Sequence, residues 1–398
     1  MSQRQCITLA AGGTGGHMFP AHALGIELEK RGYRVTLISD ARGLKFPGLL
    51  EGMEKHQISA GSVSRGGILG RLRTGLDLIA GVFQARRFLI ADRSQTVVGF
   101  GGYPALPTIL AARWLGIPYC IHEQNSVLGR VNRMVAGGAS SVALSFADTA
   151  KVPRRASARA VVTGNPVREE IAALAAQSYP AVGPDSIFRV LVLGGSQGAR
   201  ILSDVVPAAL AMMPGAARKR FQVTQQCREE DLERVRRTYS EADIAAEVGI
   251  FFEDMPERLQ WTHFVISRAG ASTISELTAA GRPSILVPLA IATDDHQTTN
   301  AKALVEAGGA WLFDESGFTP AALAKRVQKL ALNPAELTRA AAATRAAGMP
   351  DATRLLADLV EEAAVSGRAK DQAAGVQPKG TKEKPDTPPG NQSRRVMA

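Results

Sequence analysis

Residues 9–24 read LAAGGTGGHMFPAHAL, and this stretch decides the fold. It continues an apolar run into a turn in which four glycines surround Thr14, and a helix-forming segment follows. Glycine lets a backbone turn sharply and approach a ligand closely. The free N–H groups of the first helical turn then favour an anion. A phosphate site is therefore expected here, and a tight turn that binds nothing is the alternative.

The same device occurs a second time in the chain. VLGGSQGAR, at residues 192–200, also places a glycine-rich turn after an apolar run and before a helical pattern. Two such turns predict two doubly wound domains of α/β class, which resemble Rossmann folds and face each other across a cleft. We expect an N-terminal domain over 1–163, a C-terminal domain over 164–348, a C-terminal helix over 349–365 that packs back on the first domain, and a polar, disordered tail over 366–398.

Continuously apolar runs alternate with longer helical patterns along both halves, as in a parallel sheet covered on both faces. The expected strands are 5–11, 33–40, 96–100, 117–123, 140–146 and 159–165 in the first half, and 187–195, 221–226, 246–254, 263–270 and 283–289 in the second. Cys6, Cys120 and Cys227 are far apart and form no CxxC motif, so buried reduced thiols are expected.

Charge is divided unevenly between the halves. Residues 1–163 hold 20 Lys and Arg against 9 Asp and Glu, whereas residues 164–365 hold 20 against 25. A basic first half indicates an anionic partner, such as a phosphorylated substrate or a lipid surface. Nucleic acid is not expected, because no helix-turn-helix, RNP-type motif or zinc-ligand cluster accompanies the charge.

Residues 64–90 are a candidate contact with the membrane. Apolar side chains recur there every three or four residues, with arginines on either side (Leu69, Leu72, Leu76, Ile79 and Phe83; Arg65, Arg71, Arg73, Arg86 and Arg87). Such a stripe either packs into the first domain or lies in an anionic membrane surface.

Common nucleotide motifs fit the first glycine turn poorly. A dinucleotide fingerprint that starts at Gly13 reaches Met18 where its third glycine should stand, although Asp40 could serve as its ribose-binding acid. No lysine follows the turn, so a P-loop is excluded. His17 would lie near the positive end of a helix, which favours neutral imidazole and suits a general base. A histidine that only hydrogen-bonds the turn is the alternative.

Seven motifs in fixed order resemble the MurG family of bacterial peptidoglycan N-acetylglucosaminyltransferases over residues 5–362. They are GGTGGHMFPA (12–21), GFGGYPALP (99–107), HEQNSVLGRVNR (122–133), TGNPVR (163–168), LGGSQGAR (193–200), SRAGASTISE (267–276) and TDDHQTTNA (293–301). The resemblance implies the GT-B fold. It also implies inverting transfer of GlcNAc from UDP-GlcNAc to the muramoyl 4-hydroxyl of lipid I, which gives lipid II, with no cofactor and no metal.

The resemblance also implies the site. On the donor side, the residues beside the phosphates are Arg168, Ser196, Gln197 and Gly198, together with Gly270, Ser272 and Thr273 at a second helix start. Glu276 would bind the ribose, and Phe252 would lie near the uracil. Gln297 and Asn300 would lie near the sugar. The acceptor side comprises Thr14, Gly15, Gly16 and Asn125. We expect His17 to be the base, because it borders this phosphate turn. His122, Glu123 and Tyr103 are weaker candidates, and the role of His296 is open. The paired carboxylates Asp294 and Asp295 could suggest a cation site, but no metal is expected there.

The expected partners are UDP-GlcNAc, lipid I, the anionic cytoplasmic face of the bacterial inner membrane and other cell-wall synthesis proteins. Three alternatives remain open at this point. The chain could be a glycolipid glycosyltransferase or a UDP-GlcNAc 2-epimerase with the same fold, or a nonenzymatic membrane-bound scaffold of cell-wall synthesis.

Overall fold

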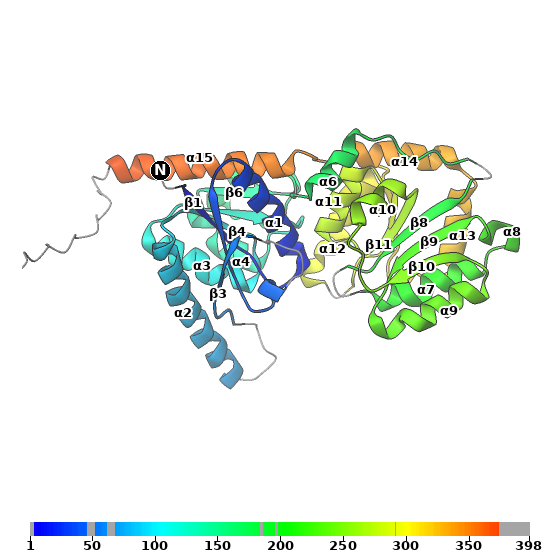
Figure 1. Cartoon of the computed structure of the whole chain (residues 1–398), viewed down its shortest axis with the longest axis horizontal. Helices are drawn as coiled ribbons and strands as arrows, with labels where there is room; N and C mark the ends of the chain where they lie inside the picture. Colours follow the sequence, from blue (N-terminus) through cyan, green and yellow to red (C-terminus); the bar gives the residue numbers. More distant parts are fainter. Residues whose placement is uncertain are drawn as a thin grey trace, which may run out of the picture.

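The computed structural model describes residues 4–45, 52–61, 68–183, 186–195, 198–290 and 292–373, and it divides into two lobes (Figure 1). The first lobe contains a sheet of parallel strands in the order β3-β2-β1-β4-β5-β6-β7. Its strands are β1 (Cys6–Ala10), β2 (Arg34–Ser39), β3 (Glu54–Gln57), β4 (Ser94–Gly99), β5 (Tyr119–Glu123), β6 (Ser141–Leu144) and β7 (Ala160–Val162). Its helices are α1 (Gly15–Lys30), α2 (Ile68–Ala91), α3 (Gly102–Leu115), α4 (Arg130–Val135) and α5 (Arg154–Ser157).

The second lobe repeats this plan with the order β10-β9-β8-β11-β12-β13, again parallel throughout. Its strands are β8 (Phe188–Leu193), β9 (Phe221–Gln226), β10 (Ala245–Gly249), β11 (Phe264–Ser267), β12 (Ser284–Leu286) and β13 (Ala310–Leu312). Its helices are α6 (Glu169–Ala172), α7 (Arg200–Ala211), α8 (Gly215–Arg218), α9 (Leu232–Glu241), α10 (Met255–Trp261), α11 (Ala271–Ala280), α12 (His296–Glu306), α13 (Pro320–Ala331) and α14 (Pro334–Ala346). Short 3₁₀ turns lie at Gly43–Lys45, Ala136–Gly138, Ala173–Ala176, Glu229–Asp231 and Thr293–Asp295.

Both sheets confirm the predicted Rossmann-like class, and each has one point where the strand order reverses. That point lies between β1 and β4 in the first sheet and between β8 and β11 in the second. Open parallel sheets bind ligands at such points, beyond the carboxyl ends of the strands. The two glycine turns follow β1 and β8, so each turn lies at the reversal point of its sheet.

Apolar side chains cover both faces of each sheet. In the first lobe Met18 and Leu24 of α1 pack on one face, and Ile109 of α3 packs on the other. Helix α15 (Ala352–Ala373) crosses back from the second lobe to the first, where Leu356 and Val360 join the same core as α1 (Figure 1). Arg31, the C-cap residue of α1, holds it there by hydrogen bonds of 2.7 Å to Asp358 and to Glu361.

The structure differs from the sequence-based expectation in three elements. β3 and β13 were not predicted, because β3 is the polar edge segment EKHQ and β13 spans only three residues. Helix α15 continues to Ala373, so the predicted start of the tail at residue 366 is wrong, and residues 374–398 lie outside the described part. Cys6, Cys120 and Cys227 are buried free thiols, as expected. Among the described residues, no helix is both long enough and apolar enough to span a bilayer.

Candidate active site

The two lobes meet at the start of α1 and the start of α11. Ser272, in the first turn of α11, donates a 3.5 Å hydrogen bond from its hydroxyl to the Gly16 carbonyl of α1. Thr14 and Gly270 are the N-cap residues of these helices, and neither provides a side-chain cap. Two helix N-termini, one from each lobe, therefore lie side by side with their first turns uncapped by side chains. Each end favours negative charge.

The geometry of the first glycine turn explains its glycines. Gly13 has φ +83°, a left-handed conformation that side chains rarely adopt. A Cβ on Gly12 would lie 2.7 Å from the carboxylate of Asp40. That carboxylate accepts from the backbone N–H groups of Gly13 (3.3 Å) and Gly43 (2.9 Å). Asp40, the candidate ribose-binding acid of a dinucleotide site, thus holds the turn in place.

His17 lies in the first turn of α1 and is half-buried. Its Nδ1 is 3.0 Å from the side-chain oxygen of Gln124. Burial lowers the pKa of His17, while the Glu123 charge and hydrogen bonds to Gln124 and the Phe100 carbonyl oppose that shift. The imidazole is therefore neutral at pH 7, as predicted, and burial is the main cause.

Glu123 and His122, the weaker candidates at the end of β5, are both buried and bonded inside the protein. Glu123 accepts from the amides of Asn125 (3.1 Å) and Gly129 (2.8 Å) and from the side chain of Asn132 (2.8 Å). His122 Nε2 is 3.0 Å from the Gly164 carbonyl, and burial lowers the pKa of His122 to about 4. Both residues shape the loop that carries Asn125. Tyr103, in contrast, is exposed.

Asn300 of α12 is the polar bridge between the lobes. It is fully buried, and its Oδ1 accepts from the N–H (2.8 Å) and hydroxyl (2.9 Å) of Ser126 in the first lobe. Its Nδ2 donates to Asn125 Oδ1 (3.1 Å) and to the Ala269 carbonyl (3.3 Å). All four hydrogen-bonding positions of this amide are thus used within the protein, although the sequence predicted a contact with the sugar.

Arg168 of the second lobe forms a second contact across the same interface, with Phe19 of α1. The Arg168 guanidinium is 3.5 Å from the Glu276 carboxylate and lies over the ring of Phe19, 5.7 Å from its centre. Burial raises the pKa of Glu276, and the Arg168 charge opposes this. The pair brings together the predicted ribose acid and the predicted phosphate-side arginine, both of the second lobe.

Helix α12 begins with a strained turn. Asp294 and Asp295 have φ of 56° and 51°, which few side-chain-bearing residues adopt. Arg133 (2.8 Å) and Lys151 (2.9 Å) of the first lobe both pair with Asp294, and their charges lower the pKa of Asp294. Asp294 is therefore occupied by cationic side chains. Gln297, one residue into α12, accepts from the Leu289 N–H at 3.0 Å.

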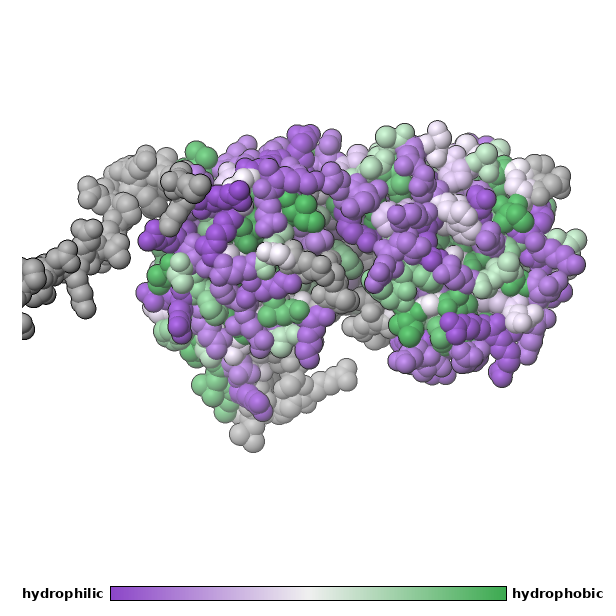
Figure 2. Space-filling model, viewed as in Figure 1, coloured by the Kyte–Doolittle hydropathy of each residue, from purple (hydrophilic) through white to green (hydrophobic). Residues whose placement is uncertain are grey.

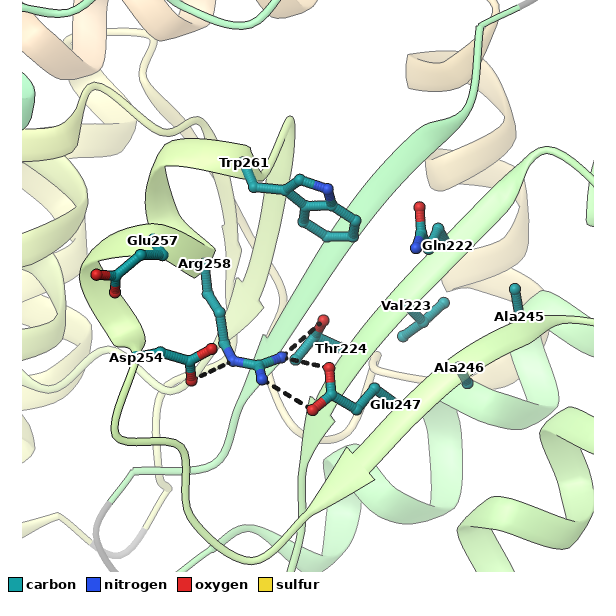
Figure 3. Close-up of a pocket in the computed structure, with 10 residues that line it drawn as sticks. All are labelled: Gln222, Val223, Thr224, Ala245, Ala246, Glu247, Asp254, Glu257, Arg258 and Trp261. Atoms are coloured by element: carbon teal, nitrogen blue, oxygen red, sulfur yellow. Dashed lines mark hydrogen bonds and ion pairs between the residues drawn. The ribbon is translucent and has the colours of Figure 1, made fainter.

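A pocket in the second lobe lies away from this interface. It has a volume of about 540 Å³ and is lined by α10 and the strands β9 and β10 (Figure 3). Arg258 lines this pocket and forms ion pairs with Glu247 (2.6 Å) and Asp254 (2.7 Å). Its guanidinium lies over the ring of Phe252, 4.0 Å from the ring centre. The Phe252 side chain is buried, so the predicted uracil contact would involve its backbone. A smaller pocket of about 90 Å³ lies between the lobes, beside Asn165 and Ser275.

The structure thus brings Thr14–Gly16, His17, Asn125, Arg168, Gly270–Thr273 and Asn300 to the interface between the lobes. Glu276 lies beside Arg168, and Gln297 is bonded to Leu289 within the second lobe. Gly198 has φ +66° in the turn after β8, and Ser196 and Gln197 lie outside the described residues. Sequence reasoning did not single out Gln124 or Ser126, which carry central bonds. The only available signal was their position beside Asn125 after a predicted strand.

Comparisons with known proteins agree with this architecture. Residues 7–144 match the glycosyltransferase family 28 N-terminal domain, and residues 189–356 match the family 28 C-terminal domain. The relative from Zymomonas mobilis named UDP-N-acetylglucosamine--N-acetylmuramyl-(pentapeptide) pyrophosphoryl-undecaprenol N-acetylglucosamine transferase is 51% identical over 90% of this chain and 92% of its own. A Sphingopyxis alaskensis protein of the same name is 52% identical over 91% and 92%.

Solved structures point the same way. The crystal structure of Acinetobacter baumannii MurG superposes with a TM-score of 0.70 at 31% identity, covering 90% of this chain and 99% of that one. A UDP-GlcNAc 2-epimerase from Neisseria meningitidis has a TM-score of 0.61 at 13% identity, covers 90% of this chain and all of its own, and shares the fold alone. Together with the two domain matches, these findings show that the chain belongs to glycosyltransferase family 28 and, within it, to the MurG family.

Proposed function

We propose that this protein transfers N-acetylglucosamine from UDP-GlcNAc to undecaprenyl-diphospho-N-acetylmuramyl pentapeptide (lipid I), which gives lipid II. The observation that carries this proposal is the meeting of two helix N-termini, those of α1 and α11, at the interface of two family 28 domains. Both substrates are diphosphates, and an uncapped helix start suits a diphosphate. Relatives about 50% identical over nine-tenths of the chain are named for this reaction.

The second lobe takes the donor in this proposal. The first turn of α11 (Gly270, Ser272 and Thr273) and the turn ending at Gly198 hold the diphosphate, with Arg168 beside it. Glu276 accepts from the two ribose hydroxyls, because a carboxylate forms strong hydrogen bonds with a pair of alcohols. Gln297 and the backbone around Phe252 contact the sugar and the uracil.

The first lobe takes the acceptor, whose diphosphate lies at Thr14–Gly16. The acceptor hydroxyl oxygen attacks the anomeric carbon, its proton passes to His17, and the bond to UDP breaks on the opposite face, so the configuration inverts. The leaving UDP carries the developing negative charge, which the start of α11 stabilises more strongly in the transition state than in the ground state. His17→Ala should lower kcat by about 100-fold or more, as expected for a lost general base.

The test is transfer of radiolabelled GlcNAc from UDP-GlcNAc to a short-chain lipid I analogue. Formation of labelled disaccharide-lipid with inverted configuration is expected. Interconversion of the free nucleotide sugar without acceptor would instead identify a 2-epimerase, and transfer to diacylglycerol would identify a glycolipid glycosyltransferase. Binding of UDP without turnover of any substrate would leave only the scaffold alternative.

We also propose that α2 places the protein on the cytoplasmic face of the inner membrane. Leu72, Leu76, Ile79 and Phe83 are each more than half exposed and share one face of α2, while its opposite face packs against α3. Figure 2 shows hydrophobic groups on the surface of this lobe, at the lower left where Figure 1 has α2. Exposed Trp114 packs edge-on against Phe83 at 5.5 Å and beneath Arg86 at 5.0 Å. Aromatic and basic side chains of this kind suit the headgroup region.

Co-sedimentation with vesicles tests the membrane proposal. The wild type should bind vesicles that contain an anionic phospholipid, and Leu76→Asp should weaken that binding by about tenfold or more, since it buries a charge instead of an apolar side chain. Leu332→Asp, at an equally exposed leucine of the second lobe, is the matched control. Equal loss in both variants, or no loss in either, would contradict the assignment to α2.

A further inference from the structure

A continuous row of hydrogen bonds connects the interdomain connection to His17. It begins at the Gly164 carbonyl, which lies 3.0 Å from His122 Nε2. His122 Nδ1 is 3.0 Å from Gln124 Nε2, and Gln124 Oε1 is 3.0 Å from His17 Nδ1. His122 and Gln124 are both buried, whereas His17 at the end of the row is half-buried.

Each bond in the row has a direction that chemistry dictates. A carbonyl only accepts, so His122 Nε2 must carry a proton and donate it to Gly164. His122 is neutral because burial lowers its pKa to about 4, and its Nδ1 therefore holds a lone pair that accepts from the Gln124 amide. The amide oxygen of Gln124 then faces His17, and it can only accept. His17 must donate from Nδ1.

The remaining nitrogen of His17 is consequently the unprotonated one. We propose that Gln124 and His122 are positioning residues that hold His17 in its Nδ1–H tautomer, so that the Nε2 lone pair is free to take the proton of the acceptor hydroxyl. The inference rests on the proposed function, in which His17 is the base. It adds why this ring is in the productive tautomer, and it assigns a role to two residues that contact no substrate.

The surroundings of Nε2 fit this assignment. Gly101 and Gly102, both with left-handed φ (+83° and +72°), lie beside the His17 ring. A Cβ on Gly102 would lie 3.3 Å from His17 Nε2, so the missing side chain leaves the space beside the lone pair open. The other groups that act on His17 are Glu123, the Phe100 carbonyl and, from α12 across the interface, His296. On this tautomer the Phe100 carbonyl can accept only from the Nδ1–H, which it shares with Gln124.

The tautomer can be measured without any activity assay. The intact protein labelled with ¹⁵N-histidine contains six histidines, and His17→Asn identifies the resonances of His17. We expect His17 to show a protonated Nδ1 and an unprotonated Nε2 at pH 7.5. Gln124→Leu should abolish that preference. A protonated Nε2 in the wild type, or an unchanged pattern in Gln124→Leu, would overturn the proposal.

Kinetics then test the consequence. Gln124→Leu should lower kcat by about 10- to 100-fold with little change in KM, because substrates still bind but the base is misdirected. Gln124→Glu should move the acid limb of the pH profile about one unit or more toward higher pH, since a carboxylate beside Nδ1 stabilises imidazolium. A purely structural role would lower kcat without moving that limb.

Gln225→Leu provides the matched control. Gln225 is a buried glutamine of β9 in the second lobe, bonded to Tyr239 and Leu202, and its loss should leave the pH limb and the His17 resonances unmoved. If His17 has the expected tautomer but His17→Ala retains full kcat, His17 is not the base, although Gln124 and His122 still fix its tautomer. If His17→Ala loses activity as expected but Gln124→Glu leaves the acid limb of the pH profile unchanged, the positioning role of Gln124 and His122 is wrong while the base assignment holds.

Discussion

Replacing Asn300 by leucine should destabilise the protein well beyond what the change in side-chain shape alone would cause. The amide makes four hydrogen bonds across and beside the interface, at 2.8–3.3 Å. Leucine leaves the buried N–H of Ser126 and the Ala269 carbonyl without partners. An orphaned buried group costs about 1–3 kcal/mol, whereas hydrophobic burial of leucine offsets part of this loss. We expect the free energy of unfolding to fall by about 2–4 kcal/mol.

Urea titration of Asn300→Leu, Ser126→Ala and the double variant forms the assay. The Ser126 hydroxyl donates only one of the four bonds, so the coupling between the two substitutions should be about 0.5–1.5 kcal/mol. Asn333→Leu is the control, because Asn333 caps α14 within the second lobe and should cost about 1 kcal/mol with no coupling to Ser126.

The reasoning fails if Asn300→Leu costs less than about 1 kcal/mol, or if its effect and that of Ser126→Ala simply add. Either result would mean that the lobes do not hold this contact in solution. The bond directions themselves are secure, because the Ser126 N–H can only donate and therefore faces the amide oxygen of Asn300.

Three further predictions concern pH, the donor and metal. His122 has a pKa of about 4 in the folded chain and about 6.5 in the unfolded chain, so the unfolded state binds the proton first as the pH falls. The free energy of unfolding should therefore fall by up to about 3 kcal/mol between pH 6.5 and pH 4. A urea midpoint that does not change across this pH range would contradict the prediction. Glu276→Gln should raise the KM for UDP-GlcNAc about tenfold or more, because it removes a charged hydrogen bond to the ribose. Glu257→Gln, on the exposed face of α10, is the control and should leave this KM unchanged. Transfer activity should persist in EDTA because Arg133 and Lys151 already neutralise Asp294, and strict loss of activity with recovery on added Mg²⁺ would refute this.

Much of the fold is legible in the sequence because its signals are local. Apolar runs buried on both faces identify parallel strands, and glycine turns followed by helices identify the βα units. β3 escaped notice for the opposite reason, since EKHQ is a polar edge strand held by its backbone pairing with β2. The stripe on α2 was ambiguous for a related reason: periodicity shows that a face is apolar, but it does not show what covers that face.

The candidate site divides in the same way. The glycines, His17 and Glu276 can be identified from the sequence, because the local motif around each residue indicates its role. Gln124, Ser126 and the bridging role of Asn300 depend on partners up to 175 residues away in the chain. A hydrogen bond needs its two atoms within about 3 Å and aligned, which no residue spacing encodes.

The sequence by itself determined two α/β domains, their glycine turns and the family resemblance, because backbone conformation and strand burial follow from nearby residues. Only the tertiary structure decided that the start of α1 faces the start of α11 and that Asn300 closes the interface. Those outcomes depend on how the two lobes pack against each other. The packing brings together groups that are far apart in the chain, and the fixed donor and acceptor roles of these groups determine which hydrogen bonds form.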